Sequence, residues 1–415
     1  MPFINFIYMI ASLYLNKTMK LLLELSEEAL NKCVKCGLCK SVCPTYPYIE
    51  EEAGYARGRL ALVELTAKGE LPLTREVAQH WDQCAMCRRC EWICPNGVEY
   101  KEIMVHAKQQ QAQELGAGFV KSAGLKALEL LQSKAGRKMI KLAGMVLDAL
   151  PVNEIKTPFP TGAVKFMPKP TAEAFGLRGK VFKAQEEKGR LLFFTGCMVD
   201  AFYGKTGENA IKLLNRAGYT VVVPKDIKCC GAPHYYSGNT QAFEKLKGHN
   251  LKELSKYDFD AVVVVCPTCG GALQEDYKLQ KPVYDFAELI FKSPLKFKGR
   301  GEKITFHVPC HSYSAMKVSD KVFYGLMERV EGDEVRKAQK DKSCCGFAGL
   351  FSITNPQIAD KVQEEKIKDL EQTEAELVLT TCPGCVLNLR DGVKKHRTGQ
   401  EVMHLADYLA HRLEE

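Results

Sequence analysis

The feature that most constrains this sequence is a pair of four-cysteine runs, each with the spacing C-x2-C-x2-C-x3-C-P. The two runs are Cys33, Cys36, Cys39 and Cys43 before Pro44, and Cys84, Cys87, Cys90 and Cys94 before Pro95. At this spacing three thiols converge from one tight turn, which suits the corners of a [4Fe-4S] cube. C-x2-C pairs also suit tetrahedral zinc, which is the competing interpretation. The complete run occurs twice with both prolines, and this favours two cubane iron–sulfur clusters.

In proteins with two such clusters, the fourth cysteine of each run ligates the other cluster. We therefore expect one cluster on Cys33, Cys36, Cys39 and Cys94, and the other on Cys84, Cys87, Cys90 and Cys43. A helical pattern over Gly58 to Lys68 separates the runs, and a polar, glutamine-rich helix follows the second. These patterns predict an α-helical ferredoxin-like domain over residues 19–112.

A second cysteine pattern is repeated beyond Gly189. The first copy contains Cys197, Cys229, Cys230, Cys266 and Cys269, and the second contains Cys310, Cys344, Cys345, Cys382 and Cys385, with offsets of 113 to 116 residues. Strand-like segments recur with the cysteines: Arg190–Phe194 with Lys303–His307, Ala261–Val265 with Glu376–Thr380, and Val283–Asp285 with Val402–His404. Short apolar strands alternating with helices such as Gly207–Ala217 predict a parallel sheet in an α/β domain, formed twice. The expected domains are residues 190–298 and 299–415.

Each copy brings five thiols from three loops at the ends of predicted strands. Five soft ligands exceed what one zinc ion takes. Gly231 and Gly346 follow the adjacent cysteine pairs and give the backbone the freedom to bend sharply there. Buried reduced cysteines or adventitious zinc are the alternatives, but the recurrence of the whole pattern favours a larger iron–sulfur cluster. The eight cysteines of the N-terminal runs and these ten account for all 18, which leaves none for a disulfide.

Residues 113–189 are expected to form a helical segment and a linker. Between Gly116 and Leu150, apolar residues recur at helical spacing among basic ones. The apolar set is Val120, Leu128, Leu131, Ile140, Leu142, Met145 and Val146; the basic set is Lys121, Lys126, Lys134, Arg137, Lys138 and Lys141. We expect a helix packed on its own protein with a solvated face; docking on a membrane surface or a partner subunit is the alternative. Prolines from Pro151 to Pro170 indicate an extended linker.

The composition narrows the class and the compartment. Charged residues make up 26% and hydrophobic residues 46% of the chain, which is typical of a globular protein. The net charge of +8 is spread over the chain and does not indicate nucleic-acid binding. The apolar stretch of residues 1–15 lacks the basic start and cleavage site of a secretory signal and is too short to span a bilayer. We expect residues 1–18 to be an unstructured extension, with a short interfacial anchor as the alternative. We expect the whole protein to be cytoplasmic.

These motifs resemble the iron–sulfur subunits of glycolate and lactate oxidases, together with the heterodisulfide reductase catalytic subunit and a related subunit of anaerobic glycerol-3-phosphate dehydrogenase. The resemblance covers nearly everything from Leu22 to the C-terminus. The segment from Cys84 to Tyr100, Cys43-Pro44-Thr45-Tyr46 and Arg57-Gly58-Arg59-Leu60 are most similar to the glycolate oxidase branch. Ala56 stands where that branch usually has proline.

The resemblance implies a fold class and a set of ligands. The fold is α+β and multidomain, an α-helical ferredoxin-like domain followed by two α/β cysteine-rich (CCG) domains. Some glycolate oxidase relatives lack the first cysteine of C-P-x-C, whereas Cys266 and Cys382 are both present here. Complete five-cysteine copies are similar to the heterodisulfide reductase subunit, and imply one noncubane [4Fe-4S] cluster on each copy.

The resemblance also implies an electron relay. The sequence has neither a G-x-G-x-x-G fingerprint nor a Walker loop, so flavin is expected on a separate FAD-containing dehydrogenase subunit. That subunit would oxidise a 2-hydroxy acid, and electrons would pass through this chain to a quinone, a carrier or a membrane subunit. The chain would then be bound peripherally to the inner face of the membrane. The alternative hypothesis is that this chain is itself catalytic and cleaves a disulfide at a noncubane cluster. A third hypothesis is a zinc-stabilised scaffold. No catalytic residue is assigned, but His234, His307 and His311 lie near cluster cysteines as candidate proton or hydrogen-bond donors.

Overall fold

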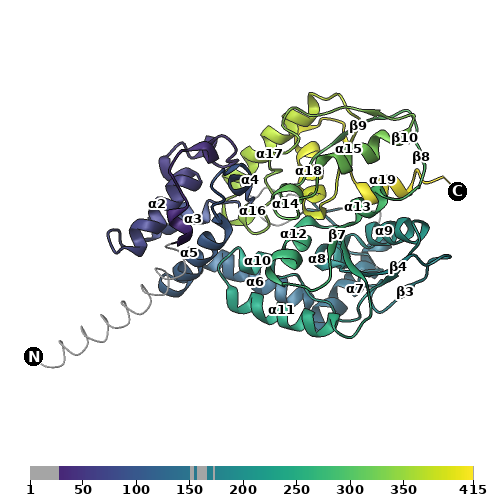
Figure 1. Cartoon of the computed structure of the whole chain (residues 1–415), viewed down its shortest axis with the longest axis horizontal. Helices are drawn as coiled ribbons and strands as arrows, with labels where there is room; N and C mark the ends of the chain where they lie inside the picture. The colour runs from purple at the N-terminus through teal and green to yellow at the C-terminus, as the bar shows by residue number, and fades with distance from the viewer. Residues whose placement is uncertain (1–27, 150–153, 157–165, 172, 415) are drawn as a thin grey trace, which may run out of the picture. The chain divides into compact units, whose positions relative to one another are not determined.

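The computed structural model describes residues 28–149, 154–156, 166–171 and 173–414 (Figure 1). They form two compact units. Unit 1 is the chain up to Gly118 together with Tyr235–Asn239, and unit 2 is Phe119–His234 together with Thr240–Glu415. The expected extension at residues 1–18 lies outside the described residues.

Unit 1 is helical throughout its described residues, as predicted. Its elements are the short 3-10 turns η1 (Leu38–Lys40), η2 (Tyr46–Tyr48) and η3 (Glu52–Gly54), and the helices α2 (Ala56–Ala67), α3 (Arg75–Asp82), α4 (Arg89–Ile93) and α5 (Tyr100–Glu114). Trp81, Ile103 and Met104 are buried where α2, α3 and α5 pack together. The ferredoxin-like character of this unit stays a prediction.

The turn into α2 is tightly packed around its glycine. A β-carbon on Gly58 would lie 1.8 Å from the backbone oxygen of Glu52, so only glycine fits there. Ala56 is the first residue of α2, a position at which proline is also favoured. The substitution of alanine for the usual proline is therefore compatible with the same turn.

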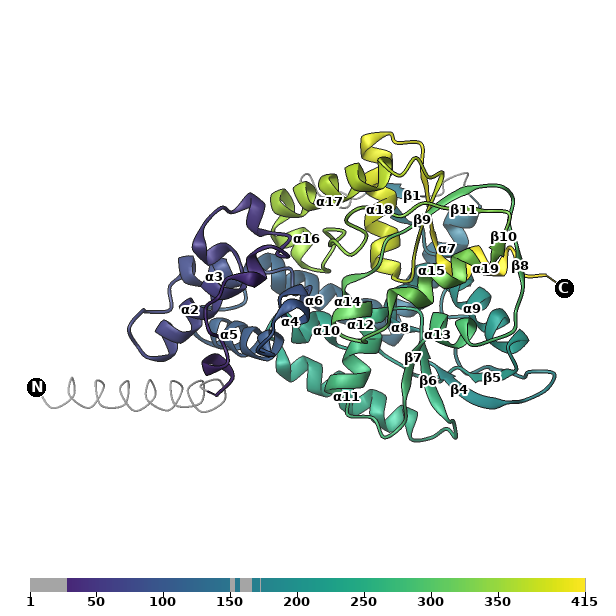
Figure 2. The ribbon, with the colours of Figure 1, turned by 45° about the horizontal axis from the view of Figure 1, so that its top comes forward.

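The first cysteine repeat forms a five-stranded sheet in unit 2, in the order β3-β5-β4-β6-β7. Figure 2 labels four of its strands, β5, β4, β6 and β7. All of its pairings are parallel except that of the edge strand β3. The strands are β3 (Val181–Phe182), β4 (Gly189–Phe193), β5 (Tyr219–Val222), β6 (Ala261–Val264) and β7 (Val283–Asp285). The helical elements are α8 (Gly196–Phe202), α9 (Gly204–Arg216), α10 (Ala232–Tyr235), α11 (Thr240–Leu254), α12 (Pro267–Gly271), the π-helical turn η4 (Ala272–Asp276) and α13 (Phe286–Phe291).

The second repeat forms a parallel sheet in the order β11-β9-β12-β13, which matches β5-β4-β6-β7 strand for strand. Its strands are β9 (Lys303–Phe306), β11 (Glu334–Val335), β12 (Leu377–Thr380) and β13 (Glu401–His404), with β8 (Phe297–Lys298) and β10 (Val330–Glu331) forming a separate parallel pair. Its helices are α14 (Cys310–Ser314), α15 (Asp320–Glu328), α16 (Phe351–Thr354), α17 (Pro356–Glu371), α18 (Pro383–His396) and α19 (Leu405–Ala410). The prediction of two parallel α/β sheets is confirmed.

The prediction of one helix over residues 116–150 is wrong in one respect, because the segment forms two helices. They are α6 (Phe119–Gln132) and α7 (Lys134–Asp148). Ser133 ends the first and caps the second, since its Oγ accepts a hydrogen bond of 2.9 Å from the amide of Gly136. A β-carbon on Gly136 would lie 1.9 Å from the Leu130 carbonyl, so the close turn depends on glycine.

The apolar face of this segment is also not packed as expected. Leu125 and Ile140 are buried. Five of the seven apolar residues that define the periodicity are exposed: Val120, Leu131, Leu142, Met145 and Val146. Downstream, the predicted linker contains an antiparallel pair of short strands, β1 (Glu154–Lys156) and β2 (Phe166–Pro168).

The two repeats are joined by polar contacts between α9 and α19. Asp407 accepts hydrogen bonds of 2.7 Å from Thr206 Oγ1 and 2.8 Å from Asn209 Nδ2. Both donors are buried. His404, at the start of α19, donates from Nε2 to the carbonyl of Val265 at 3.1 Å, because its Nδ1 accepts from the amide of Ala406.

We predict that Asp407→Ala destabilises unit 2 by about 1–3 kcal/mol, because it leaves two buried donors without an acceptor. The measurement is the urea midpoint of the anaerobically prepared full chain. The matched control is Glu208→Ala, which removes only an exposed ion pair with Lys205 on α9 and should cost at most about 0.5 kcal/mol. Equal midpoints for the two variants would contradict the prediction.

Candidate metal centres

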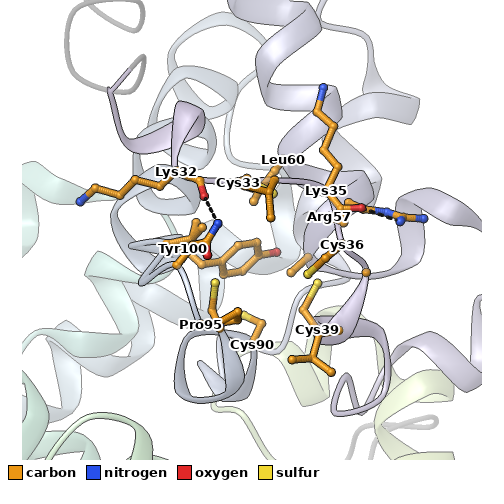
Figure 3. Close-up of a pocket in the computed structure, with 17 residues that line it drawn as sticks. Lys32, Cys33, Lys35, Cys36, Cys39, Arg57, Leu60, Cys90, Pro95 and Tyr100 are labelled. Atoms are coloured by element: carbon orange, nitrogen blue, oxygen red, sulfur yellow. Dashed lines mark hydrogen bonds between the residues drawn. The ribbon is translucent and has the colours of Figure 1, made fainter.

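One cavity in unit 1 gathers cysteines from both N-terminal runs (Figure 3). Its cysteines are Cys33, Cys36 and Cys39 of the first run and Cys90 and Cys94 of the second. Two other lining residues bind the loop of the first run: Arg57 donates a 2.9 Å hydrogen bond to the carbonyl of Lys35, and Asn96 donates one of 3.2 Å to the carbonyl of Lys32. The thiols of the first cluster expected from the sequence therefore line one cavity.

A second cavity in unit 1 gathers the remaining thiols. It is lined by Cys43 of the first run and by Cys84, Cys87 and Cys90 of the second. Cys90 borders both cavities. The fourth cysteine of each run thus lies with the first three of the other run, which is the arrangement that crossed ligation needs.

The same two backbone positions shape both runs, which are offset by 51 residues. Lys35 and Gly37 in the first run, and Met86 and Arg88 in the second, have φ angles between 51° and 82°. This left-handed conformation is strained for residues other than glycine. Arg88 stands where the first run has Gly37. An ion pair of 2.7 Å from Arg88 Nε to Glu91 Oε2 helps to hold the loop there.

Arg59 and Tyr100 lie beside the thiols of the second cavity. Tyr100 borders both cavities and donates a hydrogen bond of 3.6 Å to Cys84 Sγ. Arg59 is 1% exposed and donates to the carbonyls of His80 and Gln83 and to Thr45 Oγ1. Although burial opposes it, Tyr100 and Cys84 raise the pKa of Arg59 above its ordinary value. A permanent buried cation therefore faces these thiols, a feature that cysteine spacing alone does not predict.

In unit 2, the five-cysteine sets lie at the carboxyl ends of equivalent strands. In each repeat one cysteine follows β4 or β9, the adjacent pair follows β5 or β11, and the C-P-x-C motif follows β6 or β12. The loops after parallel strands meet at one edge of the sheet, which brings the thiols together. Cys266 and Cys382 precede α12 and α18, and the next residue, proline, opens each helix.

The bend predicted after each cysteine pair is confirmed. Gly231 and Gly346 have φ angles of 83° and 93°. Each glycine amide donates a hydrogen bond of 3.4 Å to the thiol two residues earlier, Cys229 or Cys344. Asn250 Nδ2 and Asn388 Nδ2 donate to the carbonyls of Cys229 and Cys345 at 3.0 and 2.6 Å, so a buried amide fixes each bend.

Nine of the ten thiols of the two sets influence one another's acidity in a series that crosses from one repeat to the other. The Cys345 and Cys385 thiols are 3.4 Å apart. The pKa of each thiol is shifted by the next in the order Cys197, Cys229, Cys230, Cys269, Cys266, Cys382, Cys385, Cys345 and Cys344. The sets therefore meet at Cys266 and Cys382, the cysteines that distinguish a five-thiol from a four-thiol copy.

These contacts separate the acidities of the thiols. Hydrogen bonds from Cys197 and Cys230 lower the pKa of Cys229 well below its ordinary value, and those from Cys269 and Cys382 lower the pKa of Cys266. The hydrogen bond to Cys266 raises the pKa of Cys382. The thiolate is the form that binds metal, and Cys229 and Cys266 are the thiols whose surroundings favour it. Neighbouring thiols and burial raise the pKa values of Cys197, Cys230, Cys269, Cys345 and Cys385.

The three histidines singled out in the sequence have different surroundings. His311 Nδ1 lies 2.9 Å from Thr268 Oγ1 of the other repeat. His234 is 1% exposed and borders a cavity of about 200 Å³ that also contains Glu129, Lys228 and Cys229. His307 is fully buried, and its ring lies with the thiols of Cys345 and Cys385. Burial, followed by the charge of Lys366, lowers the pKa of His307.

The donor sets fit iron–sulfur clusters better than isolated metal ions. Each cavity of unit 1 offers four or five thiols from two loops, and unit 2 offers a series of nine thiols in which the pKa of each is shifted by the next. Soft thiolates at such density are typical of iron–sulfur ligation, whereas one zinc ion takes four.

Comparison with known proteins gives the same picture. The cysteine-rich CCG domain family matches residues 191–274 and 304–390, and the 4Fe-4S dicluster domain family matches residues 29–98. A probable glycolate oxidase iron-sulfur subunit of Bacillus subtilis is 27% identical, over 93% of this chain and 94% of its own length. The glycolate oxidase iron-sulfur subunit of Escherichia coli is 25% identical, over 88% and 90%. Lactate utilization protein A of Shouchella clausii is 29% identical, over 52% of this chain and 96% of its own length.

We predict that Cys43→Ser damages the cluster served by Cys84, Cys87 and Cys90 and spares the one served by Cys33, Cys36 and Cys39. The reason is that Cys43 lies in the second cavity although it belongs to the first run. The measurement is electron paramagnetic resonance of the reduced full chain, with Cys94→Ser as the matched reciprocal variant. Loss of only the signal that depends on Cys33, Cys36 and Cys39 in Cys43→Ser would contradict crossed ligation.

Proposed function

We propose that this chain is an electron relay. It would receive electrons from a flavoprotein that oxidises a 2-hydroxy acid and would pass them to a quinone or a carrier. The chain belongs to the CCG-domain iron–sulfur proteins that include glycolate oxidase iron–sulfur subunits. The observation that carries this proposal is the density of mutually arranged thiols: two cavities in unit 1 and a nine-thiol run in unit 2. The relatives are named as iron–sulfur subunits, which supports an oxidoreductase role within an assembly of several subunits.

The ligands that we propose follow the cavities. One [4Fe-4S] cluster takes Cys33, Cys36, Cys39 and Cys94, and the other takes Cys84, Cys87, Cys90 and Cys43. Each five-cysteine set in unit 2 takes a further, noncubane-type [4Fe-4S] cluster. When bound, these groups supply one-electron storage and transfer.

The protein's own residues define how such a relay works. Tyr100 and Cys90 border both cavities of unit 1, so the two thiol sets are separated by single side chains. In unit 2, Cys266 and Cys382 shift each other's pKa, which links the two sets across the repeats. The buried cation of Arg59 favours added negative charge in the second cavity, since the charge is permanent and desolvated.

The exposed apolar face of α6 and α7 supports peripheral binding to an anionic membrane, where a quinone acceptor dissolves. Met139, Leu142 and Val146 lie on one side of α7 at spacings of three and four residues and are more than half exposed. Lys134, Lys138 and Lys141 on the same helix are exposed too. A helix with an apolar stripe flanked by lysines is typical of interfacial binding. Among the described residues, no helix is both long and apolar enough to cross a bilayer.

A disulfide-cleaving function is the second candidate. It is favoured by the two complete five-cysteine sets and by the cavity of about 200 Å³ beside Cys229, which has room for a small substrate. Neighbouring thiols lower the pKa of Cys229, as they lower that of Cys266. In this alternative the chain itself is catalytic and needs no flavoprotein to act on its substrate.

The test is to isolate the protein anaerobically from its native source and to follow both reactions. The relay predicts that an FAD-containing dehydrogenase copurifies, that its 2-hydroxy acid reduces the clusters, and that vesicles containing quinone reoxidise them, faster when the lipids are anionic. The chain expressed alone is the matched control and should contain no flavin. Disulfide reduction by the reduced chain alone, with no reoxidation by quinone, would contradict the relay and support the second candidate.

A further inference from the structure

His307 and Phe194 occupy the same place in the two repeats. Each follows the central strand of its sheet, β9 or β4, three residues before the first cysteine of its set. The amide of His307 donates to the carbonyl of Leu379 at 2.9 Å, and the amide of Phe194 donates to the carbonyl of Val263 at 3.0 Å. The backbones are therefore in register, and the two repeats differ here only in the side chain.

The imidazole of His307 is buried without a polar partner. The residue is 0% exposed, and neither ring nitrogen makes a hydrogen bond to any group of the described chain. Leaving a buried donor or acceptor unsatisfied costs about 1–3 kcal/mol. Phe194, which has no polar atom, carries no such cost at the equivalent position and is also buried.

Two thiols of the second set lie close to that ring. A ring nitrogen of His307 and the Sγ atoms of Cys345 and Cys385 lie within 4.8 Å of one another. The two thiols are themselves in contact at 3.4 Å. A cluster held by Cys345 and Cys385 would thus place sulfur beside a buried imidazole that makes no hydrogen bond within the described part of the chain.

We propose that His307 donates an N–H hydrogen bond to a sulfur of the cluster on the second five-cysteine set, and that the first set, with Phe194, lacks this donor. The inference rests on the cluster ligation proposed above. It makes His307 a tuning residue, not a ligand, since the five cysteines already supply the thiolates of that set.

The two clusters of unit 2 are therefore electronically unequal. A hydrogen bond to a cluster sulfur withdraws negative charge and stabilises the reduced form, which raises the reduction potential. The second set then has the higher potential of the two, and this gives the relay a direction across the contact between Cys266 and Cys382.

The experiment compares His307→Phe, His307→Gln and Phe194→His in the anaerobically loaded full chain. Phenylalanine copies the first repeat, glutamine retains an N–H donor, and Phe194→His offers the same donor to the first set. Potentials come from redox titration followed by electron paramagnetic resonance, and the donor is detected by pulsed resonance as an exchangeable deuteron coupled to the cluster in D2O.

We expect His307→Phe to lower the potential of one cluster in unit 2 and to abolish its exchangeable deuteron, while His307→Gln keeps the deuteron. A tenfold weaker preference for the reduced state corresponds to a shift of about 59 mV for a one-electron couple. Phe194→His should raise the potential of the other cluster.

Unchanged potentials and an unchanged deuteron in His307→Phe would overturn the inference. So would a strong nitrogen coupling in the wild type, or loss of iron from both His307 variants, because these results would make His307 a ligand. If the wild type holds no cluster on the second set, the proposed ligation itself fails, so the two failures are distinguishable.

Discussion

The interaction between Cys266 and Cys382 links the two thiol sets of unit 2, and the proposed relay through this unit depends on that link. It joins two sets of thiols that arise from strand ends in different repeats and makes them one run of nine. The thiols of this run are not equivalent, because each raises or lowers the pKa of the next. Ligation to iron would require the thiolates, so metal binding would be coupled to the packing of this edge.

Duplication organises both units, and the differences between copies show where each has a separate role. The two runs of unit 1 share left-handed backbone at equivalent positions, yet one uses Gly37 and the other uses Arg88 with Glu91 as its partner. The two repeats of unit 2 share strand order and the glycine bend, yet the first has Phe194 where the second has His307, whose ring lies beside the thiols of Cys345 and Cys385. The shared features hold cysteines in place, whereas the differing ones change the electrostatic surroundings of the thiols.

Much of the fold could be predicted from local signals. The strands around Leu192, Val263 and Val378 are short apolar runs bounded by turns, and the repeat spacing aligned them correctly. The helix break at Ser133 was missed, although a serine three residues before Gly136 is an N-cap signal, because the apolar periodicity continues through it. Periodicity also does not reveal whether an apolar face is covered, so the exposure of Leu142 and Met145 could be found only in the structure.

Contacts between residues far apart in the sequence were the other feature that the sequence did not predict. Spacing predicted which cysteines belong to each set, but not that the sets meet at Cys266 and Cys382, since the two residues are far apart in the sequence and lie in different repeats. The buried cation of Arg59 and the unpartnered ring of His307 are equally invisible without burial, because arginine and histidine are usually solvated.

Iron and sulfide analysis of the anaerobically purified full chain tests most directly whether unit 2 holds clusters. Four occupied [4Fe-4S] sites predict about sixteen irons per chain. Cys266→Ala and Cys382→Ala remove the two thiols that join the sets and should each lower the iron content and alter the spectrum of unit 2, while the signals from unit 1 persist. About eight irons in the wild type, unchanged in both variants, would contradict the claim that the nine-thiol run of unit 2 holds clusters.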